Sequence, residues 1–210
     1  MANRERLLQL TYDNKLSHIG SCLTALPIIE DIYELKGPMD RFVLDEAHAG
    51  LALFVVLESL GICNAEEMLK KHGTHSTMDV ENGVLVSGGS LGLAGAISLG
   101  MAISNKDINV FTLTSDGSMM EGIWWECLRI AKNQNVKNWK VYVNCNGLGA
   151  YGPIDTNQLE KQINSFEFPV EIRRTSSDMF LPFALGLNSH YCVMSDSQYE
   201  EAKKALEKNR

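Results

Sequence analysis

Residues 108–117 read INVFTLTSDG, an apolar run that ends at Asp116. Residues 121–136, EGIWWECLRIAKNQNV, follow with helical spacing, and residues 139–147, WKVYVNCNG, form a second apolar run that ends at Asn146. A strand, a helix and a strand in this order predict a βαβ unit with parallel strands and a right-handed crossover. The unit indicates an α/β fold, a doubly wound and mostly parallel sheet with helices on both faces.

The rest of the chain alternates helical and extended patterns, so we expect one domain across residues 1–210. A short strand is predicted at the start of RFVLDEAHAG, residues 41–50, because the apolar run breaks at Asp45 and Glu46. A further strand is predicted over residues 168–175. Further helices are predicted over residues 2–16, 17–35, 49–62, 64–73, 86–104, 156–166 and 195–208.

Composition excludes several classes of function. The 210 residues are 45% hydrophobic and 21% charged, and the formal charge is −7. Basic residues form adjacent pairs but no larger clusters. Such a balance disfavours nucleic-acid binding. The longest apolar stretch, at 51–57, is too short to span a membrane, and the N-terminus lacks the apolar core of a signal peptide. Five widely spaced cysteines without a C-x-x-C pair favour free thiols, and we expect a cytoplasmic protein.

Asp116 and Asn146 stand at the carboxyl ends of two predicted neighbouring strands, where open α/β sheets bind ligands. Their oxygens, with a following backbone carbonyl, suit Mg²⁺ and leave room for a diphosphate and a water. Gly117 and Gly147 would let the backbone approach the diphosphate, and a helix starting after Gly117 would point its amides at it. The alternative is ordinary turn chemistry, since Asp before Gly is frequent at strand ends.

Other ligand motifs fit less well. GLGAYG, residues 147–152, has dinucleotide spacing after a strand, but Pro153 follows and no apolar helix runs through the glycines. The chain has no Gly-Lys pair, which excludes a Walker loop. Cys63, His72 and His75 lack the fourth ligand and the spacing of a zinc site.

SDG at 115–117 and NG at 146–147 stand about thirty residues apart. They resemble the Gly-Asp-Gly, about thirty residues, Asn-Asn or Asn-Gly signature of thiamine diphosphate enzymes, and four further segments resemble the transketolase family of these enzymes. DNKLSHIGSCLTALPIIEDIY resembles the segment with Ser-Gly-His-Pro-Gly-Ser, and DRFVLDEAHAGLALFVVLESLG the segment with Asp-Arg-Phe-Ile-Leu-Ser-x-Gly-His-Ala. HGTHSTMDVENGVLVSGGSLGLAGAISLGMAIS resembles Pro-Gly-His-Pro and Gly-Ser-Leu-Gly-Gln-Gly, and MEGIWWECLRIAKNQNVKNWKVYVNCNGL the end of the cofactor motif. The blocks occur in family order over residues 10–150.

The resemblance implies roles for particular residues. Asp116, Asn146 and the carbonyl of Leu148 would bind Mg²⁺ or Ca²⁺. Thiamine diphosphate would be bound by the metal ligands and by a further set, Gly89, Ser90, Leu91, Gly117 and Ser118. The catalytic set would be His48 near the diphosphate, His18 and His75 nearer the substrate, and Glu121 at the subunit interface, coupled to the partner's cofactor-activating glutamate.

The chain also departs from the family pattern. Ile19 replaces a proline, Ser115 a glycine, and Leu93 and Ala94 a Gln-Gly pair. The tail, about residues 150–210, resembles a shortened form of the family's ending: it lacks Lys-Gly-Lys-Gly, and a strand–helix portion between residues 149 and 175 is expected to be missing. His190 matches the tail histidine.

The resemblance implies a function that needs two chains. We expect the pyrophosphate-binding subunit of a split transketolase, which transfers a two-carbon ketol unit from a ketose or ketose phosphate to an aldose. A partner subunit with the pyrimidine-binding domain would complete an α2β2 assembly, since no such domain fits within 210 residues. The alternatives are a related enzyme acting on a 2-oxo acid or resembling deoxyxylulose phosphate synthase, and a degenerate regulatory subunit.

Overall fold

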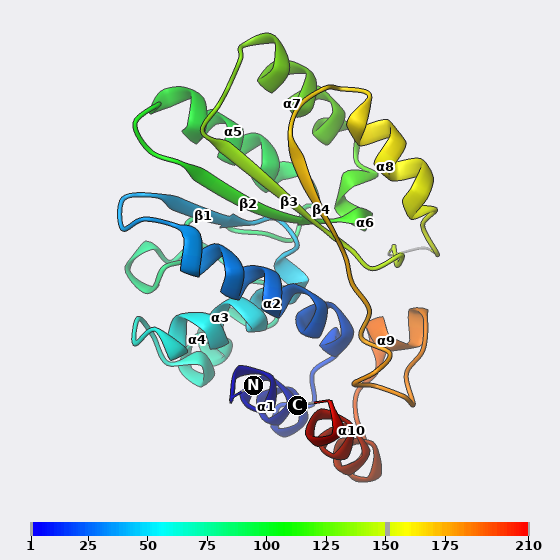
Figure 1. Ribbon diagram of the computed structural model, residues 1–210. Coiled ribbons are helices and arrows are strands. Elements are labelled where there is room, and N and C mark those ends of the chain that lie inside the picture. The colour runs from blue at the N-terminus through cyan, green and yellow to red at the C-terminus, as the bar shows by residue number, and fades with distance from the viewer. Residues whose placement is uncertain (1, 150–151, 210) are drawn as a thin grey trace.

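The computed structural model describes residues 2–149 and 152–209, which form helices on both faces of one parallel sheet (Figure 1). The strands pair in parallel in the order β1-β2-β3-β4. Their bounds are Arg41–Leu44 (β1), Val110–Ser115 (β2), Trp139–Cys145 (β3) and Val170–Arg174 (β4). The predicted α/β class is therefore confirmed. The strand order does not reverse within these four strands, so the sheet grows in one direction along the chain.

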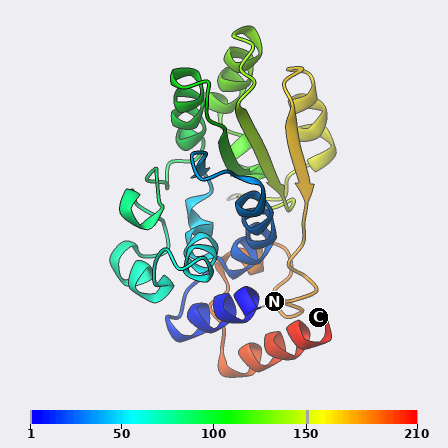
Figure 2. The same cartoon turned by 60° about the vertical axis from the view of Figure 1, so that its left-hand side comes forward.

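The two faces of the sheet carry different sets of helices (Figures 1 and 2). One face carries one helix from each connection between successive strands: α5 (Leu93–Ser104), α7 (Gly122–Asn133) and α8 (Thr156–Asn164). The other face carries α2 (Ile19–Leu35) and α3 (Gly50–Ser59), with three helices outside them: α1 (Ala2–Asp13), α4 (Ala65–His72) and α10 (Asp196–Lys208). The short elements are η1 (Ala47–Ala49), η2 (Val80–Asn82), α6 (Asp116–Met119) and α9 (Leu187–Tyr191).

Alternation along the strands builds two separate apolar cores. On β2, Phe111 and Leu113 face α2 and α3, whereas Val110 faces α5 and α7. In the second core the rings of Trp124 and Trp139 stack at 5.7 Å between centroids and 7° between planes. Both indoles are buried and both indole N–H groups are hydrogen bonded, as such groups require in an apolar interior.

Most predicted ends of helices and strands are close to those observed. Capping side chains and glycines with positive φ account for several of them. Asn64 caps α4 by accepting from the Glu67 amide, and α4 ends before Gly73, which has a φ of 71°. The helix predicted over residues 86–104 begins only at Leu93, because Gly92 has a φ of 83°. A backbone with positive φ cannot continue a right-handed helix.

The helix expected directly after Gly117 is a single turn, α6, and the long helix α7 starts only at Gly122. Ser115 caps α6 by accepting a hydrogen bond from the Ser118 amide at 3.1 Å. Glu121 then adopts an extended backbone, with φ −76° and ψ 136°, which interrupts the helix. Ser115, one of the departures from the family pattern, thus has a definite local role.

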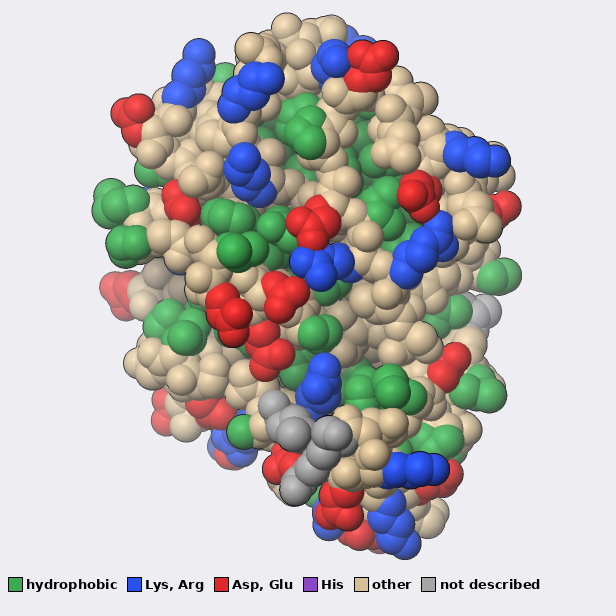
Figure 3. All heavy atoms as spheres, in the orientation of Figure 1, with side chains coloured by type: hydrophobic (Ala, Val, Ile, Leu, Met, Phe, Trp, Pro, Cys, Tyr) green, Lys and Arg blue, Asp and Glu red, His purple; other side chains and the backbone are tan. Residues whose placement is uncertain are grey.

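Three further observations concern expectations from composition. Among the described residues, no helix combines the length and apolarity that a membrane crossing needs. All five cysteines are free. On the face drawn in Figure 3, Lys and Arg side chains are scattered among Asp and Glu side chains and small apolar areas.

Gly95 of α5 provides a test of the helix packing. A Cβ placed there would lie 2.6 Å from the buried Trp124 ring, which cannot move cheaply because it is stacked and hydrogen bonded. We expect Gly95→Ala to lower the free energy of unfolding by about 1–3 kcal/mol in denaturant titrations. Gly100→Ala, in the same helix with open space around it, is the control and should raise it by roughly 0.5–1 kcal/mol. Equal stability of the two variants would contradict the close approach of α5 and α7.

Candidate active site

A cavity of about 170 Å³ opens at the carboxyl ends of the strands. Most of the predicted site residues line it: His18, His48, His75, Gly89, Leu91, Gly117, Asn146 and Leu148. Ser21, Ser115 and His190 complete the lining. The cavity thus joins the start of α2, the η1 turn, the loops between α4 and α5, and the ends of β2 and β3. It adjoins a smaller polar pocket that shares Ser21, Asn146 and Leu148.

Four of the five histidines meet in this cavity. The ring of His18 lies 5.5 Å from that of His48, 5.9 Å from His75 and 4.4 Å from His190, between centroids. His18 caps α2 with a φ of 65°, a costly conformation for a residue other than glycine, and its amide donates to the His190 carbonyl at 2.9 Å. His190, which the sequence matched only to the family's tail, therefore belongs to the same cluster.

Three of these histidines, His18, His48 and His190, are held in their neutral forms. Burial, followed by the neighbouring imidazoles, lowers the pKa of His18 to about 4 and that of His48 to about 3. Burial also lowers the pKa of His190. At neutral pH these rings are neutral hydrogen-bonding groups, and each offers one N–H donor and one nitrogen acceptor.

Asp116 lies beside Asn146, as the two strand ends predicted. One carboxylate oxygen of Asp116 accepts from the Gly147 amide at 2.6 Å and the other from the Gly117 amide at 2.9 Å. The Asn146 side-chain oxygen accepts from the Leu148 amide at 2.9 Å. Asp116 is fully buried, and burial raises its pKa to about 6 despite the backbone hydrogen bonds. No Lys or Arg side chain among the described residues pairs with this carboxylate.

Three predicted residues point elsewhere. Ser118 is fully buried and its hydroxyl donates to Asp45. Ser90 is exposed, and its carbonyl accepts from the Leu93 amide at 3.2 Å. Glu121 is exposed at the cap of α7 and does not line the cavity.

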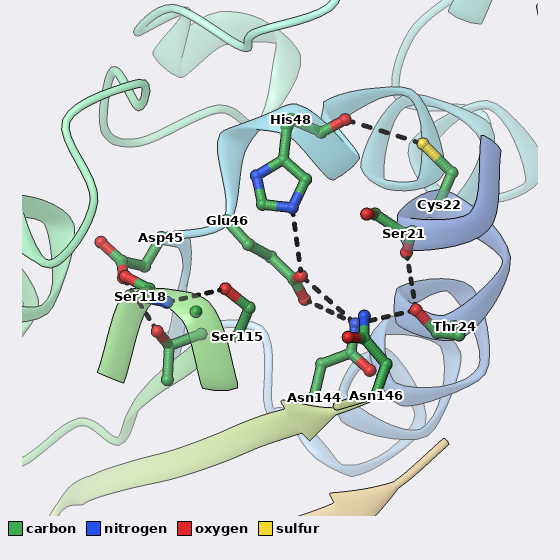
Figure 4. A network of polar contacts seen from close by, with 12 residues as sticks. Ser21, Cys22, Thr24, Asp45, Glu46, His48, Ser115, Ser118, Asn144 and Asn146 are labelled. Atoms are coloured by element: carbon green, nitrogen blue, oxygen red, sulfur yellow. Dashed lines mark hydrogen bonds and ion pairs between the residues drawn. The ribbon is translucent and has the colours of Figure 1, made fainter. Parts of the chain in front are cut away.

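Sequence reasoning missed a buried carboxylate, Asp45, directly after β1. It accepts hydrogen bonds from two amides at the start of α5, those of Gly92 and Ala94 at 3.2 Å each. It also accepts from three side chains, Thr114 at 2.8 Å, Trp124 at 3.1 Å and Ser118. Figure 4 labels Asp45 and Ser118. Asp45 thus ties the end of β1 to β2, α5, α6 and α7. The available signal was the acidic pair that ends the strand.

Glu46, the next residue, was missed as well. Its carboxyl is fully buried and receives the Asn144 amide nitrogen at 3.2 and 3.3 Å, while His48 Nε2 lies 3.9 Å away (Figure 4). Asn144 in turn donates to Thr24 at 3.0 Å and accepts from the Thr175 hydroxyl at 2.6 Å. This network connects α2, the end of β1 and the end of β3 behind the cavity wall.

The donor set suits a hard cation better than a transition metal. Asp116 and Asn146 offer a carboxylate and an amide oxygen close to the Leu148 backbone. In the part of the chain that the structure describes, no group of three or more His, Cys, Asp or Glu side chains is arranged to hold a metal ion. His72, considered for zinc, instead contacts Asp79 at 3.0 Å. Oxygen donors shared with a ligand's phosphates are typical of Mg²⁺.

The chain is similar in sequence to transketolases. It is 29% identical to a component chain of the apulose-4-phosphate transketolase of Phocaeicola vulgatus over 170 aligned positions, 71% of this chain and 60% of the relative. It is 31% identical to mouse transketolase-like protein 2 over 192 positions, 79% of this chain and 31% of the relative. Human transketolase is 29% identical over 174 positions, 72% of this chain and 28% of the relative. The chain therefore spans 60% or less of the length of these relatives, and no family model matches it.

The fold is that of solved transketolases. The Campylobacter jejuni enzyme superposes with a TM-score of 0.72 at 19% identity, covering 96% of this chain and 42% of that one. A Pichia stipitis transketolase variant in complex with fructose 6-phosphate gives 0.72 at 18%, covering 96% and 39%. At these identities the superpositions show the shared fold.

The two buried acids after β1 should respond differently when each carboxyl is replaced by an amide. Asp45→Asn replaces an oxygen acceptor by an NH₂ group facing several donors, so we expect the free energy of unfolding to fall by roughly 2–4 kcal/mol. Glu46→Gln, at the same depth, should cost less than about 1 kcal/mol, because among the described residues the Asn144 NH₂ is the donor that faces this carboxyl. Denaturant titrations at pH 7.5 measure both. Similar losses in the two variants would contradict the role given to Asp45.

Proposed function

Because the chain belongs to the transketolase family and matches an N-terminal portion of it, we propose that it is the pyrophosphate-binding subunit of a two-chain transketolase. Such an enzyme transfers a two-carbon ketol unit from a ketose or its phosphate to an aldose. The observation that carries the proposal is the cavity at the strand ends, which Asn146 and four histidines line, with the buried Asp116 next to it and hydrogen bonded to the Gly117 and Gly147 amides. The family depends on thiamine diphosphate, and the residues at this cavity fit that group.

Asp116, the Asn146 side chain and the Leu148 carbonyl would hold Mg²⁺ or Ca²⁺, and through it the diphosphate. A buried carboxylate with a raised pKa and no cationic partner among the described residues favours a bound cation. Gly89 supports the fit, because it lines the cavity with a φ of 110° and open space where a Cβ would be. Gly117 packs close to the Leu148 carbonyl and Gly149, so its backbone is within reach of the same ligand.

Thiamine diphosphate supplies the nucleophilic carbon and the electron sink that C–C cleavage of a ketose requires. The chain's own contribution is binding and proton handling. The neutral imidazoles of His18 and His190, together with the His75 ring, would bind sugar hydroxyls, which both donate and accept hydrogen bonds. Their nitrogens would also move protons to and from a reacting oxygen over short distances.

A second chain is part of the proposal. The Phocaeicola vulgatus relative is itself named as one subunit of its enzyme, and the resemblance places the cofactor-activating glutamate on a partner chain. Helix α5 bears apolar residues on its outward face as well as its inward one, with Leu93 47% and Ile97 39% exposed, and Met120 is 57% exposed. Helices that are apolar all round are usually covered. Glu121 follows Met120 directly, and an α2β2 assembly would bury it.

The activity is tested with the partner present. The chain is co-purified from its native source, the second chain is identified by mass spectrometry, and the two are combined with Mg²⁺ and thiamine diphosphate. We expect ketol transfer between a ketose and an aldose, detected by product analysis, and none from either chain alone. Decarboxylation of a 2-oxo acid in place of ketol transfer would contradict the proposed activity and indicate a different thiamine diphosphate-dependent reaction. Absence of cofactor binding by the complex would favour a regulatory role.

Cofactor binding should depend on ionised Asp116. A metal ligand must be deprotonated, so binding should weaken as pH falls through about 6, by up to tenfold per pH unit below it. Calorimetry of the complex at pH 7.5, 6.5 and 5.5 measures this. Asp116→Asn should weaken Mg²⁺-dependent cofactor binding at least about tenfold at pH 7.5. It should also remove the loss of affinity that protonation of Asp116 causes below about pH 6. Asp178→Asn, an exposed acid of the adjoining pocket, is the control and should leave both unchanged.

A further inference from the structure

The carboxyl of Glu46 is sealed between His48 and Asn144 (Figure 4). The side chain is fully buried, whereas that of His48 is 14% exposed and lines the cavity. Glu46 Oε2 lies 3.9 Å from His48 Nε2, so the carboxyl faces the imidazole from the side of the protein interior. This arrangement leaves the other ring nitrogen, Nδ1, free of Glu46.

The surroundings of Glu46 provide donors but no positive charge. The Asn144 NH₂ group approaches both carboxyl oxygens, and its oxygen is already taken by the Thr175 hydroxyl. Across the described residues, His48 is the only basic side chain within 4 Å of the Glu46 carboxyl. The other nearby charges are those of Asp45 and Asp116, both acidic. A buried carboxyl in such a place favours its neutral form.

A neutral carboxyl has an O–H group that can donate a hydrogen bond. The neighbouring groups determine which atom can accept it. The Asn144 NH₂ cannot accept it, and the Asn144 oxygen is occupied. His48 Nε2 can accept it, and a small rotation of either side chain shortens 3.9 Å to hydrogen-bond length, as often happens when an apo site tightens. We propose that Glu46 is a positioning residue whose carboxylic O–H is directed at His48 Nε2 and fixes His48 as the Nδ1–H tautomer.

The consequence is a defined role for His48. With Nε2 occupied by the Glu46 proton, His48 presents an N–H donor, not a lone pair, through Nδ1. A donor suits an anionic diphosphate oxygen or a ketose oxygen in the cavity, and this use rests on the proposed function. The tautomer itself does not, because it is set by groups within this chain. No bond to a ligand forms in this arrangement and no proton leaves the pair.

Nitrogen NMR of the histidine side chains tests the tautomer directly. The full 23.3 kDa chain is labelled with ¹⁵N, with the partner unlabelled if the chain requires it for solubility. Two-bond correlations show which ring nitrogen carries hydrogen, and a His48→Gln variant identifies the His48 signals among five histidines. We expect the proton of His48 on Nδ1 in the wild-type chain at pH 7.5. A proton on Nε2 would overturn the proposal, whether or not the complex shows ketol transfer.

Two substitutions separate positioning from packing. Glu46→Gln keeps a donor, because its oxygen can face the Asn144 NH₂ while its own NH₂ faces His48, so the Nδ1–H tautomer should persist. Glu46→Leu removes the donor at similar volume, and the proton should move to Nε2 in a chain whose backbone amide spectrum stays native. An unchanged tautomer in folded Glu46→Leu, or a changed one in folded Glu46→Gln, would count against the proposal. If Glu46→Leu does not fold, the wild type and Glu46→Gln decide.

Discussion

The site depends on one buried carboxylate, that of Asp45, which receives five hydrogen bonds from four other elements. Amides at the start of α5 and side chains of β2, α6 and α7 all converge on it. A buried carboxylate is costly unless it is saturated with donors, so each of these elements has one energetically acceptable position relative to β1. The loop that carries Gly89 and Leu91 and the turn that carries Gly117 are therefore placed by the same group.

This constraint explains how a cavity lined partly by glycines can be preorganised. Gly89 and Gly117 have no side chains to hold them, and Ser118 is attached to Asp45 from behind the wall. On the opposite wall Asn144 links Thr24 of α2 to Glu46 and Thr175. The residues that would touch a ligand thus rest on a second set of buried polar residues.

The sequence predicted the parts of this arrangement that have local signals. The ends of β2 and β3 follow from apolar runs, so Asp116 and Asn146 could be placed side by side, and family motifs added the histidines. The helix predicted over residues 121–136 agrees with the start of α7 at Gly122, whereas the helix expected directly after Gly117 is only the single turn α6, because the extended Glu121 that ends it has no strong sequence signal. Asp45, Glu46 and Asn144 were missed because their partners are distant in sequence, 120 residues in the case of Thr24 and Asn144. Only the assembled sheet brings them together.

The geometry also explains why Asp116, and not Asp45, is the candidate cation ligand, although both follow parallel strands. One oxygen of Asp45 accepts four of its five hydrogen bonds, so its lone pairs are already consumed by the fold. The two oxygens of Asp116 accept backbone hydrogen bonds from Gly117 and Gly147 and keep capacity for a further partner. These two acids follow neighbouring strands but differ in their environment. The hydrogen-bonding capacity of Asp45 is used by donors from the surrounding helices and strand, whereas Asp116 can still accept a bond from a ligand.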